Sequence, residues 1–384
     1  MQLTSKLAQN ETTIFTVMSA MAKEYNAVNL GQGFPDYDCD DRLRKLVSKH
    51  LNELKNQYAP MAGVPLLRAA ISQKINRSYQ TTVDPETQIC ITAGATQAIF
   101  TVIMAFVHKG DEVIIIEPAF DCYLPALELV GGIPKIYAMH YPDYKIDWDQ
   151  LETLVTERTR MIFINSPHNP TGTIFKKADL LALERIVTGR DIIVLSDEVY
   201  EHLIFDGELH QSVLRFPNLL QQSLAVFSFG KTFHATGWKI GYCVGAEPLI
   251  AEFKNIHQWN VFSVNSFVQY ALAEHLEDAS SYESLPQFFQ QKRDLLTKEL
   301  ASLPMQAKIS EGTYFQLYRY GDLSDLEEFA FAKYLTQEAG VAVIPLSPFY
   351  SNPPNEKVIR LCFGKKEATL KEAAYRLNKH FSYL

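Results

Sequence analysis

The chain has 384 residues, of which 47% are hydrophobic, and its formal net charge is −8. This length and composition provide a sizeable core, allow a large domain beside a smaller one, and argue against a disordered chain. The negative charge argues against a nucleic-acid partner, which needs a basic face, and the sequence contains no apolar stretch of about eighteen residues that would predict a membrane span.

Helical and apolar stretches alternate through most of the chain. A short amphipathic helix is predicted over residues 12–25 and a second helix over 41–55. Short runs rich in Ile and Val, bounded by Gly, Pro, Asp or Asn, predict strands, and helical stretches such as 95–108 and 178–189 separate most of them. The pattern predicts a mainly parallel α/β sheet that is buried on both faces. Its expected strands cover residues 88–93, 112–116, 160–164, 192–196, 224–228 and 240–244.

The pattern changes from about residue 276 onward. A long charged helix is predicted over 284–301 and another helix over 325–339, with an apolar strand near 341–344. We expect the C-terminal region, 276–384, to form a smaller domain together with the N-terminal segment, 1–40. The large domain is then expected to cover residues 41–275.

The cysteines of the sequence indicate the redox state of the compartment in which the protein folds. The five cysteines are scattered and form no Cys-x-x-Cys pair, so we expect free thiols in a reducing cytoplasm. The polar stretch 1–13 lacks the apolar core of a signal peptide. The sequence shows no cluster of Cys and His at the spacing of metal ligands, so no metal site is predicted.

Polar residues follow several predicted strands directly, at the sheet edge where α/β proteins bind ligands. Ala95 and Thr96 lie in a small-residue turn that leads into a helix, and such a turn presents free backbone N–H groups to an anion. Asp197 ends an apolar strand, where a bare carboxylate needs a partner unless it caps a helix. Asn169 lies in Asn-Pro-Thr-Gly, which is either an ordinary turn or a site that presents an amide donor. Arg360 interrupts an apolar strand and needs a carboxylate, either from the protein or from a ligand.

The most informative stretch is Ser-Phe-Gly-Lys-Thr-Phe-His-Ala-Thr-Gly-Trp-Lys-Ile-Gly, residues 228–241, which joins two expected buried strands. Burial lowers the pKa of a lysine toward neutrality, and a neutral amine can attack a carbonyl to form a Schiff base. Lys231 and Lys239 are candidates for such chemistry. A surface loop with two solvated lysines is the alternative.

Ser228-Phe229-Gly230-Lys231, followed by Thr236-Gly237-Trp238-Lys239-Ile240-Gly241, resembles the lysine region of class I/II aminotransferases. These are pyridoxal-phosphate enzymes of fold type I, and the run is similar to the subgroup of methionine and kynurenine/glutamine aminotransferases. The resemblance extends from Gly31 to Phe363. It implies a mainly parallel seven-stranded sheet flanked by helices, a smaller α+β domain, and pyridoxal 5′-phosphate as the cofactor.

The resemblance also implies roles toward that cofactor. Lys231 is expected to bind it covalently and to move a proton as general base and acid. Asp197 is expected to hold the ring nitrogen protonated, and Asn169 and Tyr200 to contact the phenolic oxygen. The remaining positions are expected to hold the phosphate or to stack on the ring: Ala95, Thr96, Ser228 and Lys239 for the phosphate, and Phe120 for the ring.

Substrate contacts follow from the same resemblance. Arg360 is expected to bind the α-carboxylate, Gly33 to offer backbone groups to it, and Asn169 to lie close by. A mostly apolar side-chain pocket is expected from four aromatic residues, Phe15, Phe120, Tyr123 and Phe262. Tyr58 and the segment 261–265 resemble elements that reach the neighbouring subunit, which implies a homodimer with shared active sites.

The sequence therefore predicts a cytoplasmic aminotransferase that moves an amino group from an L-amino acid to a 2-oxo acid by a ping-pong mechanism. Methionine is the expected donor, followed by phenylalanine, tyrosine, glutamine and kynurenine. A cysteine-S-conjugate β-lyase is the alternative that uses the same kind of site. A non-catalytic, cofactor-binding regulatory domain fits less well, because such relatives carry an added DNA-binding segment and this chain is acidic.

Overall fold

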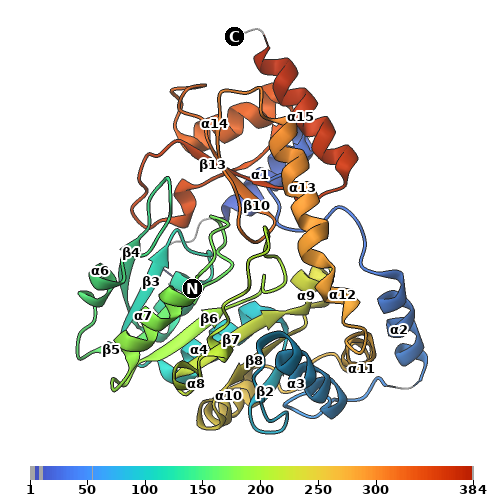
Figure 1. Ribbon diagram of the computed structural model, residues 1–384, viewed down its shortest axis with the longest axis vertical. Coiled ribbons are helices and arrows are strands. Elements are labelled where there is room, and N and C mark those ends of the chain that lie inside the picture. Colours follow the sequence, from blue (N-terminus) through green and yellow to red (C-terminus); the bar gives the residue numbers. More distant parts are fainter. Residues whose placement is uncertain (1–4, 8–11, 54, 383–384) are drawn as a thin grey trace, which may run out of the picture.

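A computed structural model describes residues 5–7, 12–53 and 55–382. Residues 1–4 and 8–11 of the expected N-terminal segment, and 383–384 of the expected C-terminal domain, lie outside this description. Figure 1 shows a lower part built around a large sheet and an upper part that contains β10, β13, α14 and α15. Helix α13 (Leu285–Glu299) runs from the lower part to the upper one.

The large sheet has seven strands in the order β2-β8-β7-β6-β5-β3-β4. All neighbouring strands pair in parallel except β8, which is antiparallel to both β2 and β7. This confirms the expected α/β class and the mainly parallel seven-stranded sheet. The strands are β2 (Ile89–Thr92), β3 (Glu112–Glu117), β4 (Ile133–Ala138), β5 (Thr159–Asn165), β6 (Ile193–Asp197), β7 (Ser223–Ser228) and β8 (Gly241–Gly245).

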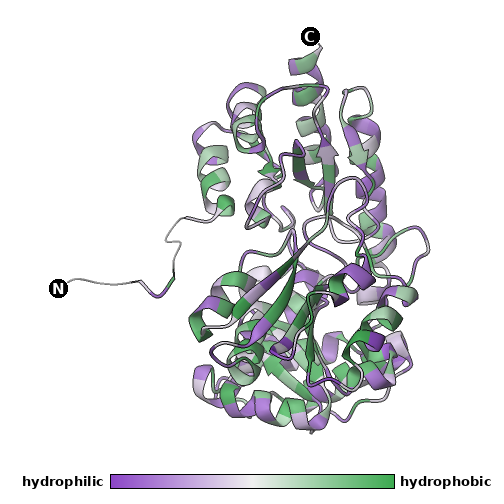
Figure 2. Cartoon of the chain, turned by 90° about the vertical axis from the view of Figure 1, so that its left-hand side faces the viewer, coloured by the Kyte–Doolittle hydropathy of each residue, from purple (hydrophilic) through white to green (hydrophobic). Residues whose placement is uncertain are grey.

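Helices cover both faces of this sheet. Successive side chains of a strand point to opposite faces, and the two hydrophobic clusters follow this alternation. In β5, Met161 and Phe163 belong to one cluster and Ile162 and Ile164 to the other. Figure 2 shows the strands mainly in the colour of hydrophobic residues and the outer helices in mixed colours. The helices of this part are α2 (Asp41–Asn52), α3 (Pro65–Tyr79), α4 (Gly94–Phe106), α5 (Tyr123–Val130), α6 (Trp148–Glu152), α7 (Lys177–Val187), α8 (Pro217–Leu220), α9 (Phe229–Thr232), α10 (Glu247–Asn260), α11 (Ser266–His275) and α12 (Ser280–Glu283).

The upper part contains an antiparallel four-stranded sheet in the order β12-β13-β10-β9. Strand β1 (Val28–Asn29) pairs in parallel with β11 (Val341–Ala342), so the N-terminal segment packs with the C-terminal region. The boundaries proposed at residues 40/41 and 275/276 stay predictions. The other elements are α1 (Ile14–Glu24), β9 (Gln306–Lys308), β10 (Phe315–Arg319), α14 (Glu328–Tyr334), β12 (Ile344–Pro345), β13 (Val358–Cys362) and α15 (Glu367–Phe381).

The carboxyl ends of the parallel strands meet at one edge of the large sheet, as parallel pairing requires. Strand β6 ends at Asp197, β7 ends at Ser228, and β2 leads into the first turn of α4. This edge faces the upper part of the molecule (Figure 1). Over the residues that the structure describes, no helix has both the length and the apolar character that crossing a membrane requires.

Candidate active site

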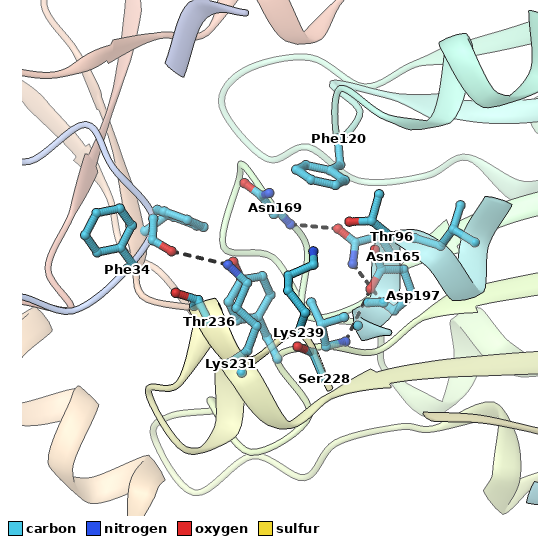
Figure 3. A pocket seen from close by; sticks show the side chains of 18 of the residues that line it. Phe34, Thr96, Phe120, Asn165, Asn169, Asp197, Ser228, Lys231, Thr236 and Lys239 are labelled. Carbon is cyan, nitrogen blue, oxygen red and sulfur yellow. Dashed lines mark hydrogen bonds between the residues drawn. The ribbon is translucent and has the colours of Figure 1, made fainter. Parts of the chain in front are cut away.

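A cavity of about 300 Å³ lies at this sheet edge. Its lining comes from the ends of the large-sheet strands, from the N-terminal segment around Gly33, and from β10 and β13 of the upper part. Figure 3 shows the side chains that surround it. Of the site residues expected from the sequence, all but Tyr58, Tyr123 and Phe262 line this cavity: Phe15, Gly33, Ala95, Thr96, Phe120, Asn169, Asp197, Tyr200, Ser228, Lys231, Lys239 and Arg360.

One end of the cavity offers groups that suit an anion. Helix α4 begins at Gly94, and no side chain caps its N-terminus, so the first backbone N–H groups stay available. Ser228 and Lys239 line the same cavity. Gly94 has φ of +78°, and an added Cβ would lie in van der Waals contact with the side chain of Lys239, 3.5 Å from Nζ, so the lysine lies beside the helix terminus. The positive charge of Lys239 and the free N–H donors of α4 therefore lie at the same end of the cavity.

Asp197 is buried, with 5% of its surface exposed. Its Oδ2 accepts a 2.6 Å hydrogen bond from the hydroxyl of Tyr123, and its Oδ1 accepts a 3.3 Å bond from the backbone N–H of Val199. Burial raises the pKa of Asp197 from 3.8 to about 6. The ion pairs of the described residues do not include Asp197. A turn rather than a helix follows it, so the helix-cap alternative is wrong.

Asn165, at the end of β5, forms hydrogen bonds with the backbone of two neighbouring site residues. Its Nδ2 donates to the backbone oxygen of Asp197 at 2.7 Å, and its Oδ1 accepts from the backbone N–H of Asn169 at 2.8 Å. It also lines the cavity, close to Asp197 in Figure 3. Asn165 thus fixes the backbone that carries two of the expected site residues.

Lys231 lies on the short helix α9, directly after β7. Its Nζ donates to the backbone oxygen of Gly33 at 3.2 Å and to the hydroxyl of Tyr314 at 3.3 Å. Burial lowers the pKa of Lys231 from 10.5 to about 8. The alternative of a solvated surface lysine is therefore wrong for Lys231, and its amine has a neutral fraction near physiological pH.

Arg360, on β13, is 1% exposed. Its Nη1 donates to Oδ1 of Asn169 at 2.7 Å, its Nη2 donates to the backbone oxygen of Gly31 at 3.1 Å, and its Nε has no partner. Among the described residues, no carboxylate lies within ion-pair distance of Arg360, and Asp121 interacts with its charge only at longer range. Burial lowers its pKa to about 10, so the guanidinium stays charged at neutral pH.

Aromatic rings surround this guanidinium. The ring centroid of Phe315 lies 3.8 Å from its central carbon, and the centroids of Phe15 and Phe349 lie 5.2 and 5.3 Å from it. Such contacts stabilise a cation at the ring face. Because the rings contact the faces of the guanidinium, a carboxylate can bind only at its polar edge.

Two expected residues lie outside the cavity of their own chain. Tyr58 is 82% exposed and Phe262 is 50% exposed, and their rings pack edge to face with centroids 5.3 Å apart. The structure therefore places both side chains on the surface. Their expected role in a neighbouring subunit stays a prediction.

Tyr123 does not line the cavity. It was expected among the aromatic residues of the side-chain pocket, but it is 3% exposed and lies behind Asp197, to which its hydroxyl donates. Its apolar ring packs beside Phe163 in the core, with centroids 5.1 Å apart. Tyr314, Phe315 and Phe349 were not expected in the site, because each reads as an ordinary core aromatic of a strand or loop.

The comparisons with known proteins agree with this geometry. The family model described as aminotransferase class I and II matches residues 25–377. The chain is 48% identical to a methionine aminotransferase of Escherichia coli, with 98% of this chain and 97% of the relative covered. It is 32% identical to kynurenine–oxoglutarate transaminase 1 of Rattus norvegicus, with 96% of each covered.

A solved structure from Escherichia coli, described as identifying a methionine aminotransferase function, superimposes with a TM-score of 0.97 at 47% identity and covers 99% of this chain and all of that one. The expected fold type I architecture and the expected kind of enzyme are confirmed. The lysine, aspartate and arginine around the cavity, together with these matches, show that the chain belongs to the class I and II aminotransferases.

Proposed function

We propose that this aminotransferase uses pyridoxal 5′-phosphate and takes its amino group preferentially from methionine. The single observation that carries the proposal is the arrangement of three groups around one cavity: the buried carboxylate of Asp197, the buried guanidinium of Arg360 and the partly buried amine of Lys231. Within the described structure, neither Asp197 nor Arg360 has an opposite charge within ion-pair distance, and Lys231 and Asp121 act on them only at longer range. A ligand with a protonated ring nitrogen and a carboxylate supplies the missing charges.

The residues present fit this cofactor by their chemistry. The N-terminus of α4 with Thr96, and Ser228 and Lys239, would hold a phosphate. Phe120 would lie against the ring, and Asn169 and Tyr200 would bind its phenolic oxygen. Asp197 would pair with the ring N–H, since a buried carboxylate is stabilised by a cation at that point. Lys231 would hold the cofactor covalently through its amine.

Pyridoxal phosphate, when bound, supplies an electron sink for the negative charge that develops at the α-carbon of the substrate. Lys231 would accept the proton from that carbon and later return a proton, since an amine with a pKa of about 8 can do both near neutral pH. Asp197 would keep the proton at the ring nitrogen. Arg360 would hold the α-carboxylate and so orient the scissile bond.

The side-chain region of the cavity supports an apolar substrate. Phe15, Phe34, Phe120 and Phe315 line the cavity, and Arg360 is the only arginine among its described lining residues. A dicarboxylic substrate needs a second cation near its side chain, whereas a thioether or an aromatic ring suits aromatic walls. The methionine and kynurenine transaminases among the relatives support the same choice. They do not favour the cysteine-S-conjugate β-lyase alternative.

A homodimer belongs to the proposal. Trp259, Tyr58 and Phe262 are 83%, 82% and 50% exposed, which is unusual for large aromatic side chains on a monomer surface. Covering these rings with a second copy of the chain would bury them. This would bring Tyr58 and Phe262 toward the neighbouring active site.

We also propose a reducing, cytoplasmic location. All five cysteines are free thiols, and Cys39, Cys90, Cys243 and Cys362 are buried. Buried free thiols are typical of proteins that do not rely on disulfides.

The proposal is tested by adding pyridoxal phosphate to the purified protein and recording visible absorption, then measuring steady-state rates over a panel of amino acids and 2-oxo acids. Methionine is expected to give the highest kcat/KM, followed by aromatic amino acids and glutamine. A protein that stays colourless would contradict the cofactor assignment. A clear preference for aspartate or glutamate would contradict the apolar pocket.

A further inference from the structure

Tyr314 forms a hydrogen-bonded triangle with the site. Its hydroxyl donates to the backbone oxygen of Gly33 at 2.5 Å and accepts from Nζ of Lys231 at 3.3 Å. Nζ of Lys231 also donates to the same backbone oxygen at 3.2 Å. The three groups come from the N-terminal segment, from helix α9 directly after β7, and from the residue before β10. One phenol therefore links both parts of the molecule to the lysine.

The phenol has little freedom to move. Tyr314 is 1% exposed, and its ring packs edge to face on Tyr200 with centroids 5.1 Å apart. Its backbone oxygen accepts from the N–H of Phe363 at 2.9 Å. An added Cβ at Gly364 would lie 3.2 Å from the ring, so the close packing continues on that side. The hydroxyl is thus held in place before any ligand binds.

We propose that Tyr314 is a positioning residue for Lys231, and that its hydroxyl and the Gly33 oxygen together hold the amine whenever that amine is not bonded to the cofactor. The inference rests on the proposed function, because it assigns a place to an amine that must be released during each half-reaction. An amine held at the cavity edge stays within reach of the substrate without occupying the substrate's place.

The triangle also affects the charge of the amine. Oxygen acceptors favour the ammonium form, because a charged donor forms the stronger hydrogen bond. The other titratable or charged groups that face Lys231 are Asp197 at the end of β6, Cys362 and Arg360 on β13, Lys239 in its own loop, and the phenol of Tyr200. Removing the Tyr314 hydroxyl takes one acceptor away from Lys231. It also removes a hydrogen bond to the phenol of Tyr200, which stays uncharged near neutral pH because burial raises its pKa. The pKa of Lys231 should then fall.

The experiment compares the parent protein with Tyr314→Phe and with the control Tyr318→Phe. Tyr318 lies on β10, the strand that directly follows Tyr314, is 2% exposed, and accepts a 2.8 Å hydrogen bond from Gln316, away from the cavity. Each substitution removes one buried hydroxyl and keeps the ring. The measured quantity is the rate at which cofactor-free protein captures pyridoxal phosphate, followed by visible absorption across a pH series, with thermal unfolding as a check of folding.

Capture requires the neutral amine, so its rate rises with pH through the pKa of Lys231. For Tyr314→Phe we expect the midpoint to move down by about 0.5–1 pH unit, with capture roughly three- to fivefold faster near pH 7 and unchanged in the alkaline plateau. Tyr318→Phe should keep the parent midpoint. An unchanged midpoint in Tyr314→Phe, or a slowing that is the same at every pH, would overturn the inference. A parent protein that captures no cofactor would instead overturn the proposed function.

Discussion

Nη1 of Arg360 donates a 2.7 Å hydrogen bond to the side-chain oxygen of Asn169, across 191 residues of sequence. Arg360 lies on β13 of the upper part, and Asn169 lies in the loop after β5 of the large sheet. The contact orients the guanidinium through an uncharged partner and leaves its charge available. A buried arginine held in this way is suited to a ligand carboxylate.

Arg360→Lys should raise KM for the amino acid donor by about 30- to 1,000-fold, because lysine loses the planar fork that binds a carboxylate through two hydrogen bonds. Steady-state kinetics with methionine would measure this. Cofactor capture should stay close to that of the parent protein. Arg319→Lys, on β10 and outside the cavity lining, is the matched control, and an equal effect at both positions would contradict the role of Arg360.

Asp197 should make the cofactor-free protein less stable as pH rises. Its folded pKa is about 6 against an ordinary value of 3.8, so between these two values the unfolded chain is ionised while the folded one stays protonated. The unfolded state then binds fewer protons, and the free energy of unfolding falls by roughly 2–3 kcal/mol from about pH 4 to above pH 6.

Urea unfolding of Asp197→Asn at several pH values tests this, because the amide does not ionise. Relative to the parent, the variant should gain stability across that window. The exposed Asp322→Asn should show no such trend. Parallel pH profiles for the parent protein and Asp197→Asn would contradict the raised pKa of Asp197.

The sequence predicts the large sheet well, because most of its strands are buried on both faces and read as continuous apolar runs. The pattern of apolar runs does not predict strand β4. It is an edge strand that contains Pro134 and Lys135, and most of its residues are exposed or only partly buried, so it has no apolar run. The number seven came from the family resemblance rather than from hydrophobic runs.

The site was predictable where a residue type and its place after a strand coincide, as for Asp197 and Lys231. Tyr123 and Tyr314 were not, because their part in the site depends on a hydroxyl that reaches another element. A buried tyrosine in a sequence looks like a core aromatic until its hydrogen-bond partner is known. The only feature of the sequence that singles out Tyr314 is its position directly before a strand, β10, that reaches the cavity.

A buried ion pair lies beneath the site. Nζ of Lys74 on α3 is 2.5 Å from Oε1 of Glu201, which directly follows Tyr200, and the two residues are 2% and 5% exposed. Lys74→Met leaves a buried carboxylate without its cation and should lower the free energy of unfolding by about 3–5 kcal/mol. The double variant Lys74→Met/Glu201→Gln should recover much of that loss.

Urea unfolding of the two single variants and the double variant measures this coupling. Arg42→Met provides the control, because its 2.8 Å pair with Asp278 is exposed, and its loss should change the free energy of unfolding far less than the loss of the buried pair. If the losses of stability in the two single variants simply add up in the double variant, the predicted coupling between Lys74 and Glu201 is wrong.

The proposed dimer predicts that a substitution at Phe262 changes the oligomeric state. Phe262→Asp would place a charge in the interface, so the variant should sediment as a monomer of 43.6 kDa where the parent sediments as a dimer. Tyr375→Asp, on α15 and 60% exposed, replaces a similar surface aromatic and should stay dimeric. A monomeric parent, or dissociation of both variants, would contradict the assigned interface.

The most direct test is to reduce the protein with borohydride in the presence of pyridoxal phosphate and to map the modified peptide by mass spectrometry. We expect a phosphopyridoxyl group on Nζ of Lys231, whose pKa of about 8 provides the reactive neutral amine. A label on Lys239 instead, or a protein left unlabelled, would contradict this expectation.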